Sequence, residues 1–256
     1  MKQNPLLESV NRQLSVDVQW QPLANTGTTN QLYSGCYQAQ PVVLRLNAAE
    51  QVMGVCRQRE DKVFNLIRNH VWAPDVLYQQ MADQSQPGWL LMKQYVTLAD
   101  APVADIYSQI LTCMTDWQQI KYLPRFDYQG LWNKYQQKID NLGGCCQAQG
   151  LLDSIRVLMK KLDELAPVKL CLVHHDLHPG NLLNDAGQLI IIDWEYAGLG
   201  TPWLDAAALV TEFSIPIRSL AALPAFRHLD SETFANGIRV AQQINQQLNM
   251  LWCACR

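Results

Sequence analysis

The chain has 256 residues, enough for one large domain or two closely associated lobes, and 48% of them are hydrophobic, enough to form a sizeable core. Its formal net charge is -3, only 17% of its residues are charged, and no basic block is present, so nothing in the composition indicates binding to nucleic acid or to an anionic membrane. A small neutral or cationic ligand fits this balance better.

The N-terminal segment MKQNPLLESVNRQL interrupts its apolar residues with Pro5, Glu8 and Asn11. It therefore lacks the apolar run of a signal peptide, and no later stretch is long enough to span a bilayer. We expect a cytoplasmic protein. The cysteines fit that expectation, because four of the eight stand singly in apolar segments and the other four form two close pairs that lack the spacing of metal ligands.

Short runs with the character of β-strands dominate the first part of the chain. They cover residues 31–37, 41–47, 73–80 and 88–96, and one helix over about residues 54–69 interrupts them. Beyond residue 96, apolar residues recur at helical spacing over residues 103–117, 151–165 and 234–252. We interpret these three stripes as the buried faces of helices.

Two apolar runs, residues 170–173 and 189–192, end abruptly in polar residues, and we expect them to form a short hairpin with functional groups at its ends. The whole pattern predicts an α+β, protein-kinase-like two-lobed fold. A small β-rich N-terminal lobe with one helix would span residues 1–95, and a larger helical C-terminal lobe residues 96–256. Many α+β proteins share this layout, so function must be argued from the site.

The strongest motif is HHDLHPGN, from His174 to Asn181, followed about a dozen residues later by IIIDWEYAG. Phosphoryl transfer needs a carboxylate that orients the acceptor hydroxyl and takes its proton, and oxygen ligands for magnesium. Asp176 is the predicted base, and Asn181 and Asp193 are the predicted metal ligands. Either aspartate alone would equally suit a turn or a strand end. All three at the separations of a kinase catalytic loop favour catalysis.

The stretches VHHDLHPGNLL and LIIIDWEYAG resemble the aminoglycoside phosphotransferase and choline kinase family, most closely its bacterial thiamine kinase and choline/ethanolamine kinase branches. The resemblance implies ATP and Mg²⁺ as cofactors and a small-molecule hydroxyl acceptor. It also implies that His174, which could otherwise be a base, supports the backbone near Asp193. Asp205 would anchor the catalytic loop, although it equally suits the first turn of a helix. The family usually has glycine in place of His175.

The N-terminal lobe should supply a cation for the nucleotide phosphates. Strand alternation in PVVLRLN turns Arg45 away from the faces of Leu44 and Leu46, and helical spacing places Glu60 on an inward face, where the two would pair. Further expected nucleotide contacts come from a Thr- and Asn-rich turn and from the strand that joins the lobes. These are Thr28, Asn30, Met92 and Tyr95.

For the acceptor we expect aromatic faces and a carboxylate, which suit a compact cation. Trp194, Glu195 and Trp203 are the candidates, although such aromatic residues equally suit the core of the lobe. Thiamine or choline is the favoured substrate. The alternatives are an aminoglycoside phosphotransferase that confers resistance and a nucleotide-binding pseudokinase scaffold. The sequence leaves the oligomeric state open.

Overall fold

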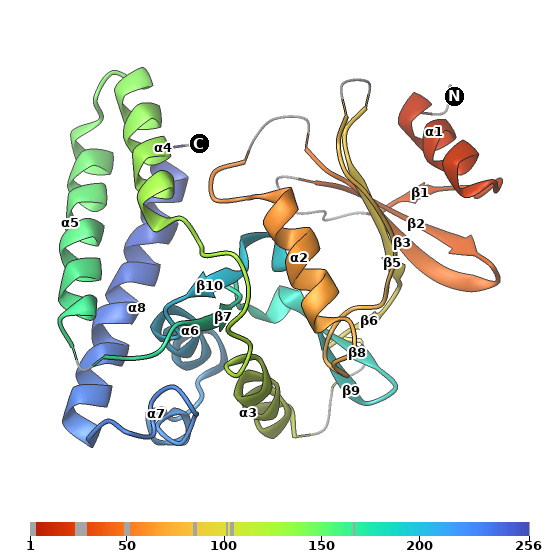
Figure 1. Ribbon diagram of the computed structural model, residues 1–256. Coiled ribbons are helices and arrows are strands. Elements are labelled where there is room, and N and C mark those ends of the chain that lie inside the picture. Colours follow the sequence, from red (N-terminus) through yellow and green to blue (C-terminus); the bar gives the residue numbers. More distant parts are fainter. Residues whose placement is uncertain are drawn as a thin grey trace.

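The computed structural model describes residues 4–23, 30–48, 52–83, 86–100, 102, 105–165 and 167–255. It has a small lobe built on a β-sheet and a larger, mainly helical lobe (Figure 1). The predicted two-lobed α+β architecture is therefore confirmed. Two of the predicted elements, residues 24–29 of the Thr- and Asn-rich turn and Val103 of the first helical stripe, lie wholly or partly outside the described residues.

The N-terminal lobe is a five-stranded antiparallel sheet in the order β1-β2-β3-β5-β4. Its strands are β1 (Gln21–Pro22), β2 (Gln31–Tyr37), β3 (Gln40–Leu46), β4 (Val76–Gln80) and β5 (Trp89–Lys93). Along β3, the buried side chains of Val42, Leu44 and Leu46 face one apolar cluster. Arg45 takes the opposite face, as the alternation predicted, and reaches helix α2 (Arg57–Ile67).

A helix at the start of the chain, α1 (Pro5–Leu14), was not predicted and gives this lobe two helices in place of one. Asn4 caps it through a hydrogen bond from the Leu6 amide, and Pro5 occupies the first turn. The side chains of Leu7 and Val10 are buried against the face of the sheet that lies opposite α2 (Figure 1). Of the residues that interrupt the apolar pattern of this helix, Pro5 and Glu8 are exposed, whereas Asn11 is buried and donates a hydrogen bond to the Val18 carbonyl at 3.0 Å.

The predicted hairpin is wrong in its pairing. Strand β7 (Cys171–Val173) pairs with β10 (Gly198–Gly200), and β9 (Gln188–Ile191) pairs with β8 (Leu182–Asp185). The chain between the two apolar runs forms its own strand, β8, which takes the place beside β9. Both runs still end at the polar residues that carry the motifs, because β7 leads into His174 and β9 leads through Ile192 into Asp193.

Helices make up most of the C-terminal lobe: α3 (Ile106–Trp117), α4 (Tyr128–Asn141), α5 (Cys146–Asp163), α6 (Trp203–Phe213), α7 (Ile217–Leu220) and α8 (Ser231–Ala254). The apolar stripes predicted the existence of α3, α5 and α8. Helix α4 was not predicted, and it contributes Trp132, Tyr135 and Ile139 to the protein interior. Short 3-10 turns, η1 (Pro179–Asn181) and η2 (Trp194–Tyr196), lie within the two motifs.

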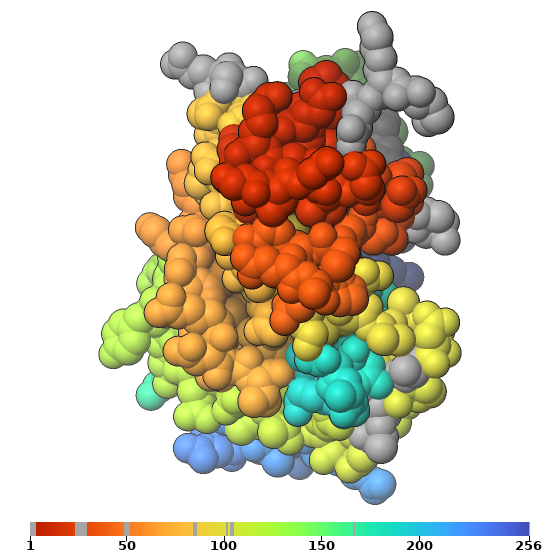
Figure 2. All heavy atoms as spheres, turned by 90° about the vertical axis from the view of Figure 1, so that its right-hand side faces the viewer, coloured from red at the N-terminus to blue at the C-terminus, as the bar shows by residue number. Residues whose placement is uncertain are grey.

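Strand β6 (Val96–Thr97) joins the lobes by pairing with β8 in a three-stranded sheet, β6-β8-β9. Beside it, Lys93 of the N-terminal lobe contacts Asp185 of the β8–β9 hairpin at 2.6 Å. Figure 2 shows this side of the molecule, with the hairpin in teal below the orange strands. The division at residues 95 and 96 remains a prediction. Among the described helices, none has the length and apolar content that a bilayer span requires.

Candidate active site

Asp205, in the first turn of α6, anchors the start of the loop from His174 to Asn181 through two hydrogen bonds. The Asp205 carboxylate accepts hydrogen bonds from the backbone amides of His174, at 2.8 Å, and His175, at 2.9 Å. Burial raises the pKa of Asp205 to about 7, although the two amide donors favour its ionised form. Asp205 therefore has the geometry of the anchor that the resemblance implied.

His174 is fully buried, and both of its ring nitrogens have partners. Nδ1 accepts the backbone N–H of Asp176 at 3.2 Å, so Nε2 carries the proton and donates to the Ile192 carbonyl at 2.9 Å. Burial lowers the pKa of His174 to about 4. The ring thus ties the catalytic loop to the residue before Asp193 and has no free nitrogen to act as a base.

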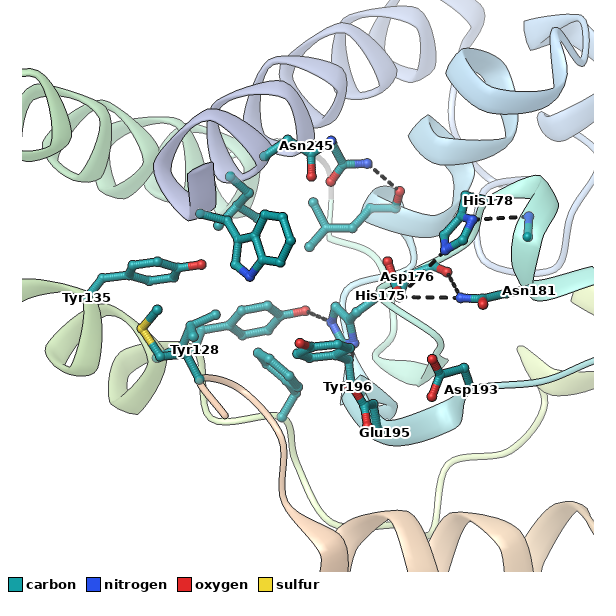
Figure 3. A pocket seen from close by; sticks show the side chains of 18 of the residues that line it. Tyr128, Tyr135, His175, Asp176, His178, Asn181, Asp193, Glu195, Tyr196 and Asn245 are labelled. Atoms are coloured by element: carbon teal, nitrogen blue, oxygen red, sulfur yellow. Dashed lines mark hydrogen bonds and ion pairs between the residues drawn. The ribbon is translucent and has the colours of Figure 1, made fainter. Parts of the chain in front are cut away.

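Asp176 and Asn181 meet across the catalytic loop (Figure 3). Asn181 Nδ2 donates to the Asp176 backbone carbonyl at 2.8 Å and lies 3.3 Å from carboxylate Oδ2. Burial raises the pKa of Asp176. The Asn181 side-chain oxygen has no hydrogen-bond donor among the described residues, and it is left to face the cavity that both residues line.

Asp193 follows β9 in a left-handed conformation, φ 63°, and lines the same cavity. The amide of the preceding Ile192 donates to the Asn181 carbonyl at 3.0 Å, which brings the two predicted metal ligands together. Burial, and then the nearby Glu195, raise the pKa of Asp193 to about 7, while Arg45 acts in the opposite direction. Arg45 Nη1 is 3.6 Å from its carboxylate.

The predicted pair of Arg45 and Glu60 is present and buried. Arg45 Nη2 donates a 2.8 Å hydrogen bond to Glu60 Oε2, and Nη1 lies 2.8 Å from Oε1 as an ion-pair contact. Burial alone would raise the pKa of Glu60, but Arg45 and Arg57 outweigh it and lower the value. Arg57 was not singled out from the sequence, because its place at the start of the helix resembles that of an ordinary solvent-facing residue.

Glu195 lines the cavity but is bound from the N-terminal lobe. Its Oε2 lies 2.9 Å from Arg57 and accepts a 3.0 Å hydrogen bond from Asn30. Asn30 also accepts from Arg57 at 2.9 Å. The expected contact of this carboxylate with an acceptor stays a prediction, and the protein's own arginine already compensates its charge. Asn30 thus lies at the site, whereas Thr28 lies outside the described residues.

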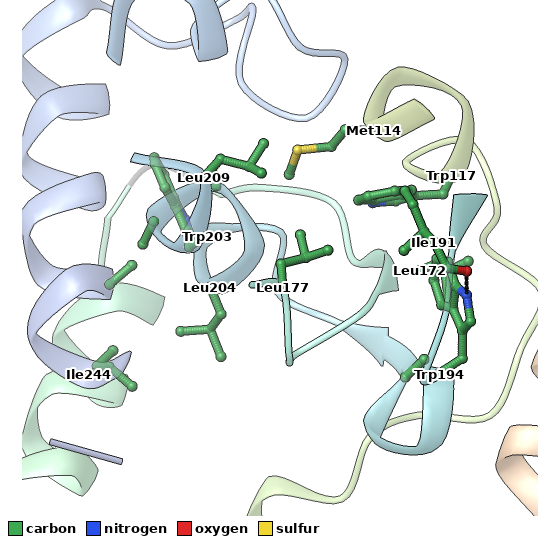
Figure 4. Close-up of a cluster of buried hydrophobic side chains, with 14 of the residues drawn as sticks. Met114, Trp117, Leu172, Leu177, Ile191, Trp194, Trp203, Leu204, Leu209 and Ile244 are labelled. Carbon is green, nitrogen blue, oxygen red and sulfur yellow. Dashed lines mark hydrogen bonds between the residues drawn. The ribbon is translucent and has the colours of Figure 1, made fainter. Parts of the chain in front are cut away.

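Trp194 and Trp203 correct the predicted acceptor pocket, because both are fully buried in the core of the lobe (Figure 4). Trp194 packs among Trp72 and Trp117 and donates to the Ile191 carbonyl at 2.7 Å. Trp203 stacks with Phe226 and Phe234. Neither lines the cavity that contains Asp176. The interpretation of these aromatic residues as core was the correct one.

A different set of aromatic side chains surrounds a cavity of about 590 Å³ beside Asp176 (Figure 3). We call the part of the cavity that these side chains line the aromatic chamber. They come from α4, η2, α8 and the segment before α4, and are Phe126, Tyr128, Trp132, Tyr135, Tyr196 and Trp252. Asn245 and Asn249 of α8 add amide groups. The α4 residues were not predicted as acceptor contacts, because the candidate aromatic residues were all taken from the sequence that follows the motifs. A tyrosine- and tryptophan-rich helix ahead of the catalytic loop was the available signal.

Charge is distributed unevenly around this cavity. Its acidic residues are Asp176, Asp193 and Glu195, and no lysine or arginine is among the described residues that line it. Met92 and Tyr95 lie outside it. Met92 is buried in β5 between β3 and β4, and the Tyr95 hydroxyl accepts the Asp75 amide at 2.7 Å. Their contact with adenine stays a prediction.

A profile of the phosphotransferase enzyme family matches residues 25–237 of the chain. The chain belongs to this family. It is 31% identical over 150 residues to thiamine kinase of Escherichia coli O157:H7, in a match that covers 53% of each protein. It is 29% identical over 163 residues to thiamine kinase of Shigella boydii, covering 52% of this chain and 57% of that one. The chain thus spans about half the length of the curated relatives it matches.

Solved structures share the fold over nearly the whole chain. Choline kinase LicA from Streptococcus pneumoniae superposes with a TM-score of 0.71 at 19% identity, covering 98% of this chain and 91% of that one. An aminoglycoside 2'-phosphotransferase-IIIa in complex with GDP gives a TM-score of 0.66 at 15% identity, with coverages of 97% and 90%. Identities this low establish a common fold and leave the acceptor to be argued from the cavity.

Proposed function

We propose that this member of the family transfers the γ-phosphate of ATP to the hydroxyl of a small organic cation, with thiamine preferred over choline. The observation that carries the proposal is the position of Asp176. Its carboxylate lies at the boundary between the oxygens of Asn181 and Asp193 on one side and the aromatic chamber on the other (Figure 3). A hydroxyl held in the chamber would meet a base and a phosphoryl donor at one point.

The residues present fit a magnesium ion. Mg²⁺ prefers oxygen ligands and is commonly bound through one or two carboxylates together with substrate phosphates. Asp193 and the unbonded side-chain oxygen of Asn181 provide such ligands, and the described residues contain no larger cluster of His, Cys, Asp and Glu that would compete for the ion. Bound there, magnesium neutralises phosphate charge in the transition state.

In the proposed reaction, the acceptor hydroxyl oxygen attacks the γ-phosphorus, the bond from that phosphorus to the bridging oxygen of ADP breaks, and Asp176 takes the hydroxyl proton. Asn181 Nδ2 orients the carboxylate, and the hydrogen bond that the Asp176 backbone N–H donates to His174 Nδ1 holds the backbone of the residue. A pKa raised by burial makes it a better proton acceptor than an exposed aspartate. Arg45, fixed by Glu60, supplies positive charge on the nucleotide side.

The chamber supports a cationic acceptor. Aromatic faces attract an ammonium or thiazolium group by roughly 0.5 to 2 kcal/mol per ring, and the acidic residues add to the attraction. Among the described lining residues there is no lysine or arginine to repel it. The thiamine kinases among the relatives favour thiamine within this class. A polycationic aminoglycoside would need more carboxylates than this mainly aromatic wall supplies.

The test is ADP release by the purified protein with magnesium and ATP, measured for thiamine, choline, ethanolamine, an aminoglycoside and 3,3-dimethylbutan-1-ol, the neutral isostere of choline. We expect kcat/KM to be highest for thiamine and lowest for the neutral alcohol. Asp176→Asn should bind ATP normally yet turn over roughly a hundredfold more slowly, since the base is lost and the shape kept. The proposal would be overturned if kcat/KM were higher for an aminoglycoside than for thiamine and choline, or if it were as high for the neutral isostere as for choline.

A further inference from the structure

His175 stands in an unusual backbone conformation at the centre of the site. Its φ is 67°, in the left-handed region that favours glycine, and the resembling family usually has glycine there. A histidine at this position carries backbone strain that glycine would not. Strain of this kind persists where the surrounding structure compensates for it, so the contacts of the side chain need an explanation.

Every polar atom of the His175 ring is engaged. Nδ1 lies 3.1 Å from the Tyr196 carbonyl, which can only accept, so Nδ1 carries the proton. Nε2 therefore accepts from the Tyr128 hydroxyl at 2.6 Å, and that hydroxyl accepts the Thr201 amide at 3.2 Å. The ring also packs against Phe126, with 4.3 Å between the ring centroids.

These contacts fix the wall of the aromatic chamber. Phe126, Tyr128 and Tyr196 all line the cavity, and His175 lines it as well (Figure 3). Gly200 allows this close packing, because a Cβ atom placed on it would lie 2.9 Å from His175 Cε1 and 2.7 Å from the Tyr128 hydroxyl. The side chain of the residue next to Asp176 thus both fills space and sets the position of two tyrosines.

We propose that His175 is a specificity-determining residue that sets an upper limit on the size of the cation that the acceptor chamber admits. This inference rests on the proposed function, since it takes the chamber as the acceptor site. Its ring occupies volume that glycine would leave open, and its hydrogen bond from Tyr128 keeps that phenol from swinging aside. His175 acts on the size and shape of the chamber and takes no part in proton transfer.

The experiment compares wild type with His175→Gly on thiamine and on a bulkier analogue in which a phenyl group replaces the methyl group of the thiazolium ring. ADP release gives kcat and KM, and calorimetry gives the affinity for each cation and for magnesium-ATP. In the variant we expect the ratio of kcat/KM values to shift toward the phenyl analogue by about tenfold, the scale on which one pocket contact discriminates. The shift should come from KM, with ATP affinity unchanged.

Two further variants guard against a merely structural effect. His175→Asn tolerates the left-handed backbone but is too short to reach Tyr128, so it should shift the ratio in the same direction. Ala186→Gly relieves a left-handed residue, φ 52°, in the exposed β8–β9 turn, and should leave the ratio unchanged.

The outcomes separate the two proposals. If wild type is active and the ratio stays constant in both His175 variants, or if ATP affinity falls in parallel with acceptor affinity, the role of His175 is overturned and the kinase assignment stands. If wild type releases no ADP with any cation of the acceptor panel, the proposed function fails and the role of His175 fails with it.

Discussion

Arg57 at the start of α2 contacts Glu195, two residues beyond Asp193, at 2.9 Å, and so links the lobes inside the active site. The same nitrogen lies 2.8 Å from Glu60, and the other terminal nitrogen donates to Asn30. One guanidinium therefore joins α2, the η2 turn that follows Asp193 and the residue that precedes β2.

Arg57→Ala should weaken magnesium-ATP binding by roughly tenfold or more, because it removes the cation that lies 2.9 Å from the buried Glu195 carboxylate and one of the contacts between the lobes. Calorimetric titration with magnesium-ATP measures this. Arg68 is the matched control, since it is exposed on the same helix and has no ion pair among the described residues. Equal ATP affinities for Arg57→Ala and Arg68→Ala would contradict the link.

Arg45 and Glu60 should behave as one unit. Removing either partner takes a buried counter-charge from the other, and breaking a buried pair typically costs about 3 to 5 kcal/mol of folding stability. Arg57 beside Glu60 and Asp193 beside Arg45 should reduce that cost. We therefore expect the Arg45→Met, Glu60→Leu double variant to lose far less stability and kcat/KM than the sum of the single variants. Denaturant unfolding and steady-state kinetics on all four proteins complete the cycle. Strictly additive losses would show that the pair is not energetically coupled.

Asp193→Ala should abolish magnesium-dependent nucleotide binding, since the variant lacks the carboxylate ligand. The measurement is an ATP titration at increasing magnesium concentration. Asp176→Asn serves as the comparison, because it changes an aspartate in the same cavity but should retain the magnesium dependence. A wild-type titration curve for Asp193→Ala would remove this residue from the metal site.

Trp203→Ala should act on stability rather than on acceptor binding. The ring is fully buried, so its loss should cost about 3 to 5 kcal/mol of unfolding free energy. Gly237→Ala should destabilise by about 1 to 3 kcal/mol through the same contact, because its new Cβ would lie 2.4 Å from the indole. Denaturant unfolding gives both values. A stable Trp203→Ala protein with a raised acceptor KM would restore this tryptophan to the acceptor site.

The buried His174 predicts a dependence of stability on pH. Its pKa is lowered to about 4 when folded, against an ordinary value of 6.5, so the unfolded chain takes up the proton first. Its contribution is present above pH 6.5 and declines as pH falls toward 4, by up to about 1.4 kcal/mol per pH unit.

The test compares wild type with His174→Gln, which keeps a donor for the Ile192 carbonyl. Asp193 and Asp205, whose raised pKa values act in the opposite direction, are present in both proteins, so the difference in unfolding free energy isolates His174. That difference should shrink between pH 6.5 and 4. A difference that is constant with pH would mean that the ring has the same pKa in the folded and unfolded protein, and would contradict the lowered value.

Local patterns predicted much of this molecule. The alternation in β3 fixed the side to which Arg45 points, and the spacing of α2 turned Glu60 toward it. Local patterns could not predict the aromatic chamber. Tyr128 and Trp252 are distant in sequence, and they come to line one cavity with Asp176 only when α4 and α8 pack around the catalytic loop. The partner of β7 likewise depended on competition among strands, which periodicity does not describe.

The position of α1 has a consequence for the fidelity of folding. Side chains alternate along β3, so sliding this strand by one residue against its neighbours would move Leu44 to the phosphate side and drive the Arg45 guanidinium into the apolar layer beneath α1. An arginine buried there, away from Glu60, would be strongly unfavourable. The apolar layer and the charged residue together therefore make the misaligned sheet less stable than the native one. The cation proposed to hold the nucleotide also ensures that the sheet around it assembles in one register.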